Sequence, residues 1–514
     1  MENIIPKEWI ECKLCDIAKW GSGGTPKSDI QEYYNGEIPW IIIGDLNDSY
    51  IYSSTKKITE LGLKNSSAKM VKPDSILIAM YGSIGKLGIN KIPLATNQAI
   101  AFTEILFSGT FNIFLFYYLL FVRKDLINCG KGGTQSNISQ TVLKDFDFIL
   151  PPLAEQKEIV KRIEELFSDL DNGVESLKKA KEQIKIYRQS VLKNAFEGKL
   201  TEKWREENPD KLESPEILLE KIKQAREEHY QKQMEEWEQK VKEWEENGKE
   251  GKKPIKPQKL TEFNVDYDLE GIPKITKDWI YIKAEFLSFF VTKGTTPESS
   301  KLFSVKGDIP FIKVYNLTKT GKIDFTIEPT FTDKETHQGF LARSIVYPDD
   351  VLMNIVGPPL GKVSIVPKYF SEWNINQAIV RYRVFEPVVN KYLAYYLLSE
   401  KTLDIMIKKS KATAGQWNLT LEICRDLPIP VCSLAEQNQI VQEIESRFSV
   451  CDKMEEAIDE DLKKAELLRQ SILKKAFSGE LTKEWRKNNP DLITGENSAE
   501  NLLKKIKAEK EAQK

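Results

Sequence analysis

The chain repeats a long stretch of its own sequence. Residues 188–210 read RQSVLKNAFEGKLTEKWREENPD and residues 469–491 read RQSILKKAFSGELTKEWRKNNPD, a shift of 281 positions. The same shift relates Leu153-Ala154-Glu155-Gln156 to Leu434-Ala435-Glu436-Gln437. A fixed long period indicates two copies of one structural unit. Two copies in one chain are expected to pack around a pseudo-two-fold axis, which suits a partner with two related sites, as duplex DNA has.

The composition predicts folded domains without an overall basic charge. The 514 residues are 41% hydrophobic and 10% aromatic, and the formal net charge is −2. Residues 1–152 carry 15 Lys and Arg against 15 Asp and Glu, and residues 271–430 carry 21 against 16. Neither region has the strongly basic footprint of a protein that binds nucleic acid tightly by itself. The charge is compatible with a DNA reader whose complex supplies phosphate contacts from other subunits.

The sequence predicts a cytoplasmic chain with reduced thiols. We find no signal peptide at the N-terminus, and the longest apolar run, residues 113–122, is too short to cross a bilayer. The six cysteines follow no pattern that the two copies share. Cys12 and Cys15 have CxxC spacing but no second pair, so we expect no zinc or other metal site.

Each copy begins with a globular part that is rich in β-branched and aromatic residues. Buried strands are predicted at residues 38–43 and 75–80, and their counterparts at 309–312 and 350–353. Shared landmarks are Gly23-Gly24-Thr25-Pro26 with Gly294-Thr295-Thr296-Pro297, and Asn97-Gln98-Ala99-Ile100 with Asn376-Gln377-Ala378-Ile379. The globular parts have otherwise diverged. A common frame with different faces predicts two different recognition surfaces.

A long helix is predicted after each globular part. Its apolar residues recur at steps of mostly 4 and 3, which is typical of a coiled-coil seam: Ile159, Ile163, Leu166, Leu170, Val174, Leu177, Ile184 and Val191. The second helix carries Ile440, Ile444, Phe448, Ile458, Leu468 and Ile472. Each helix needs a partner for its stripe, and we expect the other copy's helix to pack against it in antiparallel orientation. A further charged helix, residues 214–246, precedes a Gly- and Lys-rich linker at 248–254.

These features predict an α+β protein with two mixed α/β globular domains, separated by two long helices that pack as an antiparallel coiled coil. The predicted segments are a first globular domain, a first helical region with the charged helix and linker, a second globular domain and a second helical region: residues 1–152, 153–270, 271–432 and 433–514.

The sequence lacks the motifs of a catalyst. Residues 81–86 resemble a phosphate-binding loop, but Met80 and Leu87 stand where that motif needs Gly and Ser or Thr. Pro151-Pro152 lacks the neighbours of an adenine methyltransferase motif, and no GxGxxG loop suggests bound S-adenosylmethionine. His229 and His337 lie in unlike contexts, and each is expected to be an isolated surface residue. We therefore predict that the chain is not an enzyme.

Candidate DNA-binding residues lie on the globular loops. The loop at 81–86 is either a tight hairpin or a phosphate contact through Ser83 and Lys86. The repeated Gln135 and Gln416 are more readily explained as turn or cap residues than as adenine readers, since shared residues cannot give different specificities. The full set of candidates is Lys27, Tyr33, Tyr34, Tyr81, Ser83, Lys86, Lys131, Thr134, Lys313, Tyr315, Asn316, Lys362, Lys411 and Trp417.

The whole chain resembles the specificity subunit of type I restriction–modification systems. The marks are the Leu-Ala-Glu-Gln helix starts at 153 and 434, the loops that end at Pro26 and Pro297, and the repeated segments from Arg188 and Arg469. The resemblance implies two target recognition domains that each read half of a split double-stranded DNA site, with the helices as a spacer. The long charged helix after Asp210 is a departure whose role the resemblance does not give.

The resemblance also implies the partners. Two methyltransferase subunits, which bind S-adenosylmethionine, are expected to dock on the helices, and a motor subunit with ATP and Mg is expected to cut unmodified DNA, while this chain binds no cofactor. The expected partner-binding residues are Leu153, Glu155, Gln156, Phe196, Trp204, Leu434, Glu436, Gln437, Phe477 and Trp485. The alternative is a two-domain coiled-coil adaptor that does not touch DNA, which the weak net charge favours.

Overall fold

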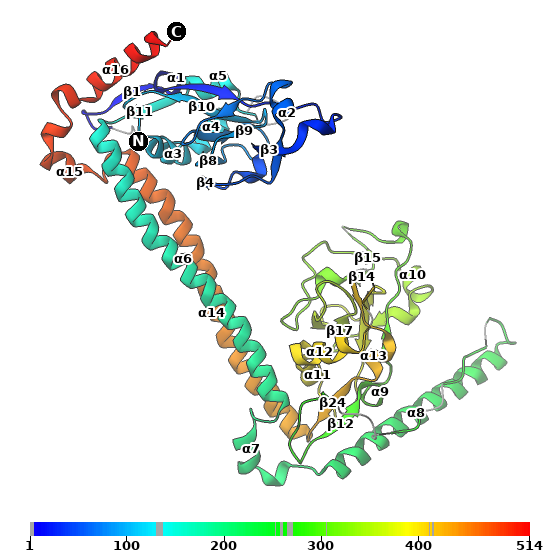
Figure 1. The fold of residues 1–514 in the computed structure, drawn as a ribbon. Helices are drawn as coiled ribbons and strands as arrows, with labels where there is room; N and C mark the ends of the chain where they lie inside the picture. The colour runs from blue at the N-terminus through cyan, green and yellow to red at the C-terminus, as the bar shows by residue number, and fades with distance from the viewer. Residues whose placement is uncertain are drawn as a thin grey trace. The chain divides into compact units, whose positions relative to one another are not determined.

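The computed structural model describes residues 5–129, 137–251, 253–257, 261–264, 271–304, 306–410, 412–413 and 416–513. The chain divides into two compact units (Figure 1). Unit 1 contains residues 1–179 and 458–514, and unit 2 contains residues 180–457. This division cuts across the four consecutive segments predicted from the sequence, because each unit combines one globular part with a portion of both long helices.

The globular part of unit 1 is built on two sheets and one strand pair. The five-stranded sheet has the order β2-β10-β7-β8-β4, the four-stranded sheet has the order β5-β3-β9-β6, and β1 pairs with β11. The strands are β1 Ile10–Lys13, β2 Ala18–Ser22, β3 Tyr34–Ile41, β4 Ser49–Ile51, β5 Lys56–Ile58, β6 Met70–Val71, β7 Ile76–Ala79, β8 Leu87–Asn90, β9 Leu94–Thr96, β10 Ile100–Leu106 and β11 Asp147–Leu150.

Unit 2 repeats this topology apart from β4, which has no counterpart in the sheets of its described residues. Its sheets have the orders β13-β21-β17-β19 and β15-β14-β20-β16, β12 pairs with β24, and a further small sheet has the order β18-β23-β22. The strands are β12 Ile280–Lys283, β13 Thr292–Lys293, β14 Ile309–Ile312, β15 Phe331–Thr332, β16 Ile345–Val346, β17 Val351–Asn354, β18 Val356–Gly357, β19 Val363–Ile365, β20 Trp373–Ile375, β21 Ile379–Tyr382, β22 Ala412–Thr413, β23 Gln416–Asn418 and β24 Pro428–Val431.

Short helices cover the sheets, and long ones leave the globular parts. In the first globular part they are α1 Leu14–Ile17, α2 Glu60–Lys64, α3 Asn112–Phe121, α4 Arg123–Cys129 and α5 Gln140–Asp145. In the second they are α9 Ala284–Leu287, α10 Lys334–Gln338, α11 Asn390–Leu398, α12 Glu400–Lys408 and α13 Leu421–Arg425. The remaining helices are α6 Leu153–Phe196, α7 Glu202–Glu207, α8 Pro215–Glu246, α14 Leu434–Phe477, α15 Lys483–Asn488 and α16 Ala499–Ala512.

The central strands could be predicted from the sequence because β7 is apolar throughout and β17 is apolar up to its last residue, Asn354. All four residues of β7 are buried, and all four residues of its counterpart β17 are buried as well. Strands covered on both faces read as continuous apolar runs. Local signals recur with the repeat: the side chain of Ser139 caps α5, and that of Thr420 caps α13.

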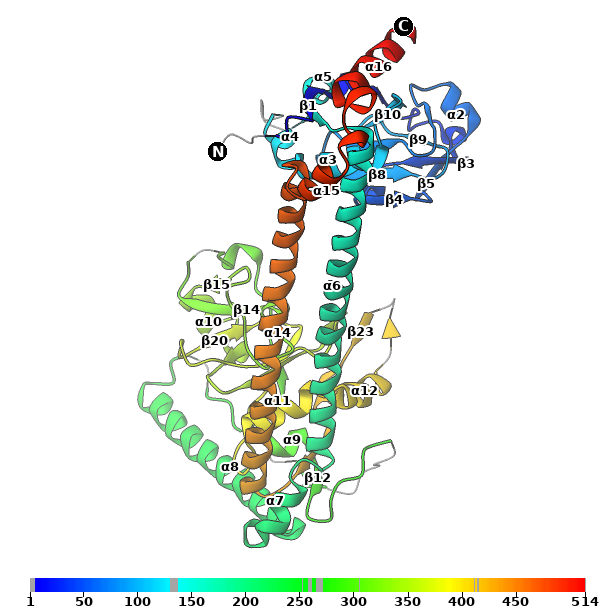
Figure 2. The same cartoon turned by 90° about the vertical axis from the view of Figure 1, so that its left-hand side faces the viewer.

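The two long helices pack side by side in antiparallel orientation within each unit, as predicted (Figure 2). In unit 1 the guanidinium of Arg469 lies 4.3 Å from the ring centroid of Phe167. In unit 2 the guanidinium of Arg188 lies 4.9 Å from the ring centroid of Phe448. These two contacts are equivalent under the repeat.

The predicted seam is wrong at two positions. Leu166 is 39% exposed and Leu468 is 51% exposed, whereas Phe167 is 6% exposed. The buried stripe of α6 runs through Ile159, Ile163 and Phe167, because steps of four residues keep these side chains on the face that packs against the globular part and α14.

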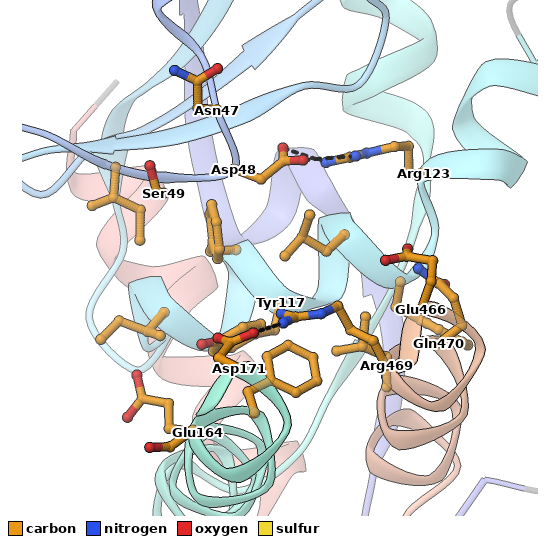
Figure 3. A pocket seen from close by; sticks show the side chains of 18 of the residues that line it. Asn47, Asp48, Ser49, Tyr117, Arg123, Glu164, Asp171, Glu466, Arg469 and Gln470 are labelled. Carbon is orange, nitrogen blue, oxygen red and sulfur yellow. Dashed lines mark hydrogen bonds and ion pairs between the residues drawn. The ribbon is translucent and has the colours of Figure 1, made fainter. Parts of the chain in front are cut away.

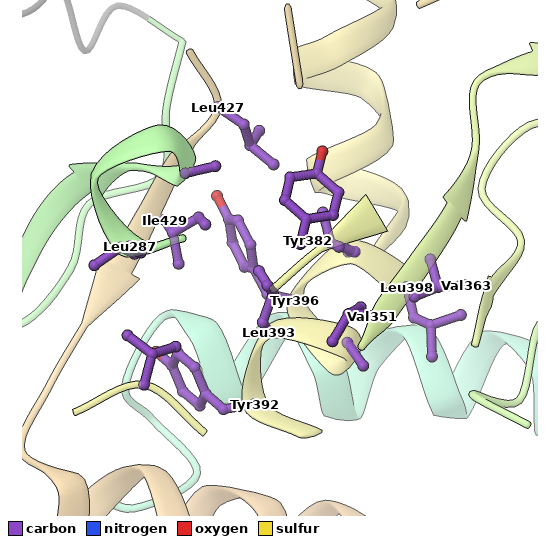
Figure 4. Close-up of a cluster of buried hydrophobic side chains, with 14 of the residues drawn as sticks. Leu287, Val351, Val363, Tyr382, Tyr392, Leu393, Tyr396, Leu398, Leu427 and Ile429 are labelled. Atoms are coloured by element: carbon purple, nitrogen blue, oxygen red, sulfur yellow. The ribbon is translucent and has the colours of Figure 1, made fainter. Parts of the chain in front are cut away.

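Each globular core is completed by the end of the other copy's helix. In unit 1, Leu473 and Phe477 from α14 are buried together with Phe114 and Phe148. In unit 2, Leu192 and Phe196 from α6 join the cluster around β17, β21 and α11 (Figure 4). The buried tyrosines of that cluster are satisfied by backbone: Tyr392 donates to Pro430 O at 2.8 Å and Tyr396 donates to Pro428 O at 2.7 Å. Burial raises the pKa of Tyr392 well above its ordinary value, so this hydroxyl remains a donor.

Candidate nucleic-acid interface

One loop edge recurs in both globular parts. In unit 1, the Gly23–Pro26 loop lies against the turn at Asn97–Ala99, where Gly24 N donates to Thr96 O at 2.9 Å and Asn97 N donates to Ile41 O at 3.0 Å. Met80 N donates to Ala99 O at 2.8 Å, which brings the loop after β7 to the same edge. These loops come from four different parts of the chain. The strand ends therefore gather them into one surface.

Unit 2 reproduces this edge bond for bond. Thr295 N donates to Ile375 O at 3.2 Å, Asn376 N donates to Ile312 O at 3.1 Å, and Ile355 N donates to Ala378 O at 2.8 Å. The loop after β17 therefore occupies the place of the loop after β7. The framework is shared, although exposed residues next to it differ, as Lys27 and Glu298 do.

Glycine is required where the loop meets the turn. A Cβ atom added to Gly23 would lie 2.0 Å from Thr96 O, and one added to Gly294 would lie 2.1 Å from Ile375 O. Real Cβ atoms do not approach backbone oxygens this closely, so the loop could not pack against the turn with a residue other than Gly at these two positions. This explains why both landmarks begin with Gly.

Several predicted DNA-binding residues of unit 1 lie on this edge. Lys27, Tyr81 and Ser83 are exposed, and Lys86 is half-buried. Tyr33 and Tyr34 are also half-buried, and Tyr34 Oη donates to Pro26 O at 2.6 Å, so its hydroxyl supports the loop. Contact of these residues with DNA remains a prediction.

Arg123 supports the loop at 81–86. Its guanidinium donates to both carboxylate oxygens of Asp48, at 3.0 and 2.5 Å. A Cβ atom on Gly85, whose φ is +78°, would lie 2.8 Å from Arg123 Cγ. The left-handed conformation of Gly85 and the ion pair beneath it fix the conformation of the loop. A fixed loop is compatible with both interpretations of residues 81–86, a tight hairpin and a phosphate contact.

In unit 2 the prediction for Asn316 is wrong. Its side chain is completely buried, and its Nδ2 donates to Asp324 O at 3.1 Å and to Ile327 O at 2.8 Å. Both N–H groups of the amide bond the loop that follows Asn316, so the amide has no free donor for DNA. The neighbouring Lys313, Tyr315 and Lys362 are half-buried. Lys131, Thr134 and Lys411 lie outside the described residues, as does the side chain of Trp417.

A second repeated constellation surrounds the helix starts. Glu155 is fully buried and accepts from Trp9 Nε1 at 2.8 Å and from Thr482 Oγ1 at 2.6 Å, and it pairs with Arg486. We call this cluster the carboxylate lock of unit 1. A charge this deep is stable because one ion pair and two further donors satisfy it.

The carboxylate lock of unit 2 has the same form. Glu436 accepts from Trp279 Nε1 at 2.9 Å, from Thr201 Oγ1 at 2.7 Å and from Arg205 Nη1 at 2.6 Å. The threonines and arginines of the two locks are related by the repeat, but the sequence does not indicate that they contact the glutamates.

The locks correct part of the partner prediction. Glu155, Gln156, Glu436 and Gln437 are at most 1% exposed, so their side chains hold the fold instead of a partner. Gln156 accepts from Phe111 N at 2.8 Å, and Gln437 accepts from Val389 N at 3.0 Å. Two further predicted residues, Phe196 and Phe477, are buried in the cores. Trp204, Trp485 and Leu153 are half-buried, and Leu434 is 36% exposed. Contact of these four residues with a partner remains a prediction.

A groove of about 860 Å³ opens in unit 1 between the globular part and the helices (Figure 3). Tyr117 and Phe167 are among the aromatic residues that line it, and Arg469 pairs with Asp171 at its edge. Burial raises the pKa of Glu164, a further lining residue, above its ordinary value.

The structure also corrects the histidine prediction. His337 is 2% exposed, and its ring nitrogens lie 2.7 Å from Asn374 Oδ1 and 3.1 Å from Glu372 Oε2. His229 is stacked on Phe289 at a centroid distance of 3.9 Å. Within the described part of the chain, His, Cys, Asp and Glu form no cluster of three or more that could hold a metal ion. No helix in the same part is long and apolar enough to cross a membrane.

Comparison with known proteins gives this architecture a family. The type I restriction modification DNA specificity domain matches the chain twice, at residues 6–185 and 284–464. The chain belongs to this family. As a specificity subunit it is 26% identical to the EcoBI specificity subunit of Escherichia coli, over 99% of this chain and 94% of that protein. It is 25% identical to the EcoKI specificity subunit of Escherichia coli strain K12, over 99% and 97%.

A solved structure supports the fold of the specificity subunit. That structure, described as one of the complex assembly and conformational transition of the type I R-M system, matches with a TM-score of 0.57 at 15% identity. The match covers 92% of this chain and 98% of the other. The α+β class, the internal repeat and the long paired helices predicted from the sequence are confirmed.

Proposed function

We propose that this chain is the DNA-reading subunit of a type I restriction–modification complex, and that each loop edge reads one half of a split target. The observation that carries the proposal is the repeated loop edge, in which the same backbone hydrogen bonds hold different outward-facing residues. Two copies of one frame with unlike faces suit two unlike half-sites on one duplex. The proposed location is the cytoplasm.

Methyltransferase subunits are the proposed partners, with motor and nuclease subunits joining in the full complex. The family membership supports this assignment, and the near-neutral globular parts support it as well, because such a reader depends on other subunits for phosphate contacts. S-adenosylmethionine, ATP and Mg would bind those partners. This chain contributes recognition and carries no catalytic centre of its own.

Selection from a random duplex library tests the proposal. The purified chain, together with the methyltransferase subunit from its host, should enrich a bipartite motif, and methylome sequencing of that host should show the same motif. Exchanging residues 1–152 for those of another family member should change one half-site and leave the other intact. Enrichment of no motif would support the adaptor alternative.

A further inference from the structure

The exposed pairs Thr25–Gln98 and Thr296–Gln377 are a shared feature of the loop edges that recognition of unlike half-sites does not explain. Gln98 and Gln377 are both exposed, and each follows an Asn whose Oδ1 accepts from the backbone two residues further on, at 3.2 Å in both units. The Asn side chains therefore maintain the turn. The Gln side chains lie on the outside of that turn.

Each Gln is oriented by a threonine. Thr25 Oγ1 donates to Gln98 Oε1, and Thr296 Oγ1 donates to Gln377 Oε1. One lone pair of each Gln carbonyl is thus occupied. Among the hydrogen bonds of the described residues, Gln98 and Gln377 take part through Oε1 alone, and neither Nε2 group donates to an acceptor. Each loop edge therefore presents two N–H donors in a fixed position.

Donors held in this way suit an acceptor-only partner. Gln reads adenine by pairing both its oxygen and its nitrogen with the base edge, and here threonine already occupies one of the two lone pairs of that oxygen and so fixes its direction. Phosphate oxygens accept only, and they are the same at every step of a duplex. A residue that two unlike readers share must contact what the two half-sites have in common.

We propose that Gln98 and Gln377 each donate to a phosphate of the DNA backbone, one at each half-site, and so position the unshared residues over the bases. This inference rests on the proposed DNA-reading function. The charge next to the pair differs between the copies, since Lys27 follows Pro26 whereas Glu298 follows Pro297. The amide is therefore the shared element of the contact.

The test compares alanine and arginine at both positions, in the full chain with its methyltransferase partner. Affinity for a duplex that carries the selected motif is measured as a function of salt, and the preferred motif is selected again for each variant. Q98A and Q377A should each weaken binding by roughly tenfold or more and leave both half-sites unchanged, because a hydrogen bond to a charged DNA phosphate is lost. Thermal melting verifies that each variant folds.

Arginine should act in the opposite direction. Q98R and Q377R place a cation near the phosphate, so log affinity should fall with log salt more steeply, by about one unit for each substitution. The matched control is Q239R on α8, where the side chain of Gln239 donates to Glu243 of the same helix at 3.2 Å, and the slope should not change.

Each result decides between explanations. A changed base preference in Q98A or Q377A would make these residues base readers and overturn the inference. Unchanged affinity in the alanine variants, together with an unchanged slope in the arginine variants, would reduce the pairs to loop supports and also overturn it, with the proposed function intact. A wild-type complex that selects no motif would remove both.

Discussion

At the scale of single residues, the carboxylate lock combines tight packing with a buried charge. We predict that E155Q destabilises unit 1 by about 3–5 kcal/mol, because Arg486, whose side chain is 12% exposed, would lose its counter-charge. The amide oxygen of Gln can still accept from Trp9 Nε1, but its NH2 group then replaces the oxygen that accepts from Thr482 and Arg486, so the loss combines the charge with these accepted hydrogen bonds. Urea unfolding followed by the fluorescence of tryptophan measures the effect.

Glu165 provides the matched control for that prediction. It lies one helical turn from Arg162 on α6, at 3.6 Å, and its side chain is 52% exposed. E165Q should cost less than about 1 kcal/mol, since water solvates both charges. Equal losses in E155Q and E165Q would show that burial does not set the strength of the lock.

At the scale of elements, α8 packs on the globular part of unit 2 and α16 packs on that of unit 1, each through an isoleucine at an equivalent position. Ile222 of α8 and Ile506 of α16 are each 0% exposed. Beyond this point the helices differ, because α16 ends at Ala512 whereas α8 continues to Glu246. We predict that I222A and I506A each cost about 2–5 kcal/mol, measured by chemical denaturation, because each leaves a cavity beneath its helix.

The distal part of α8 should contribute little to that stability. Trp237 Nε1 donates to Pro254 O at 3.1 Å and Trp244 Nε1 donates to Gly251 O at 3.3 Å, so the chain returns along the helix that it has just left. W244A should therefore leave the unfolding midpoint of unit 2 nearly unchanged and increase amide exchange only near residues 244–251. A large drop in the midpoint would mean that the tip of the helix supports the core.

Periodic features of this chain are visible in its sequence, whereas contacts between distant positions are not. The helix starts at Leu153 and Leu434 and the central strands could be predicted, since apolar period and proline placement are local. The role of Glu155 could not, because Thr482 and Arg486 lie more than 300 positions away in the chain and nothing local indicates burial. The prediction that Asn316 binds DNA was wrong for a related reason, because an amide that could read adenine can equally hold a loop by hydrogen bonds to its backbone.

At the scale of the whole molecule, the chain passes from one compact unit to the other within the long helices α6 and α14. The boundaries fall between residues 179 and 180 in α6 and between 457 and 458 in α14. Each unit contains one carboxylate lock, one loop edge and one core, and none of these features crosses the boundary. Residues inserted at these two boundaries therefore fall outside the locks, the loop edges and the cores.

We predict that one heptad inserted at both boundaries lengthens the gap between the half-sites and changes neither half-site. Seven residues add about 10 Å of helix, or about three base pairs. Inserting in both helices keeps the antiparallel pairs matched, and a heptad returns each apolar stripe nearly to its original direction. Methylome sequencing of a host with the modified gene gives both the gap and the half-sites.

An insertion in α6 alone would shift Arg188 against Asp452 and Glu455 and should abolish methylation, which separates a change in length from a mismatch in pairing. If the double insertion altered a half-site while the gap stayed constant, the helices would not set the spacing.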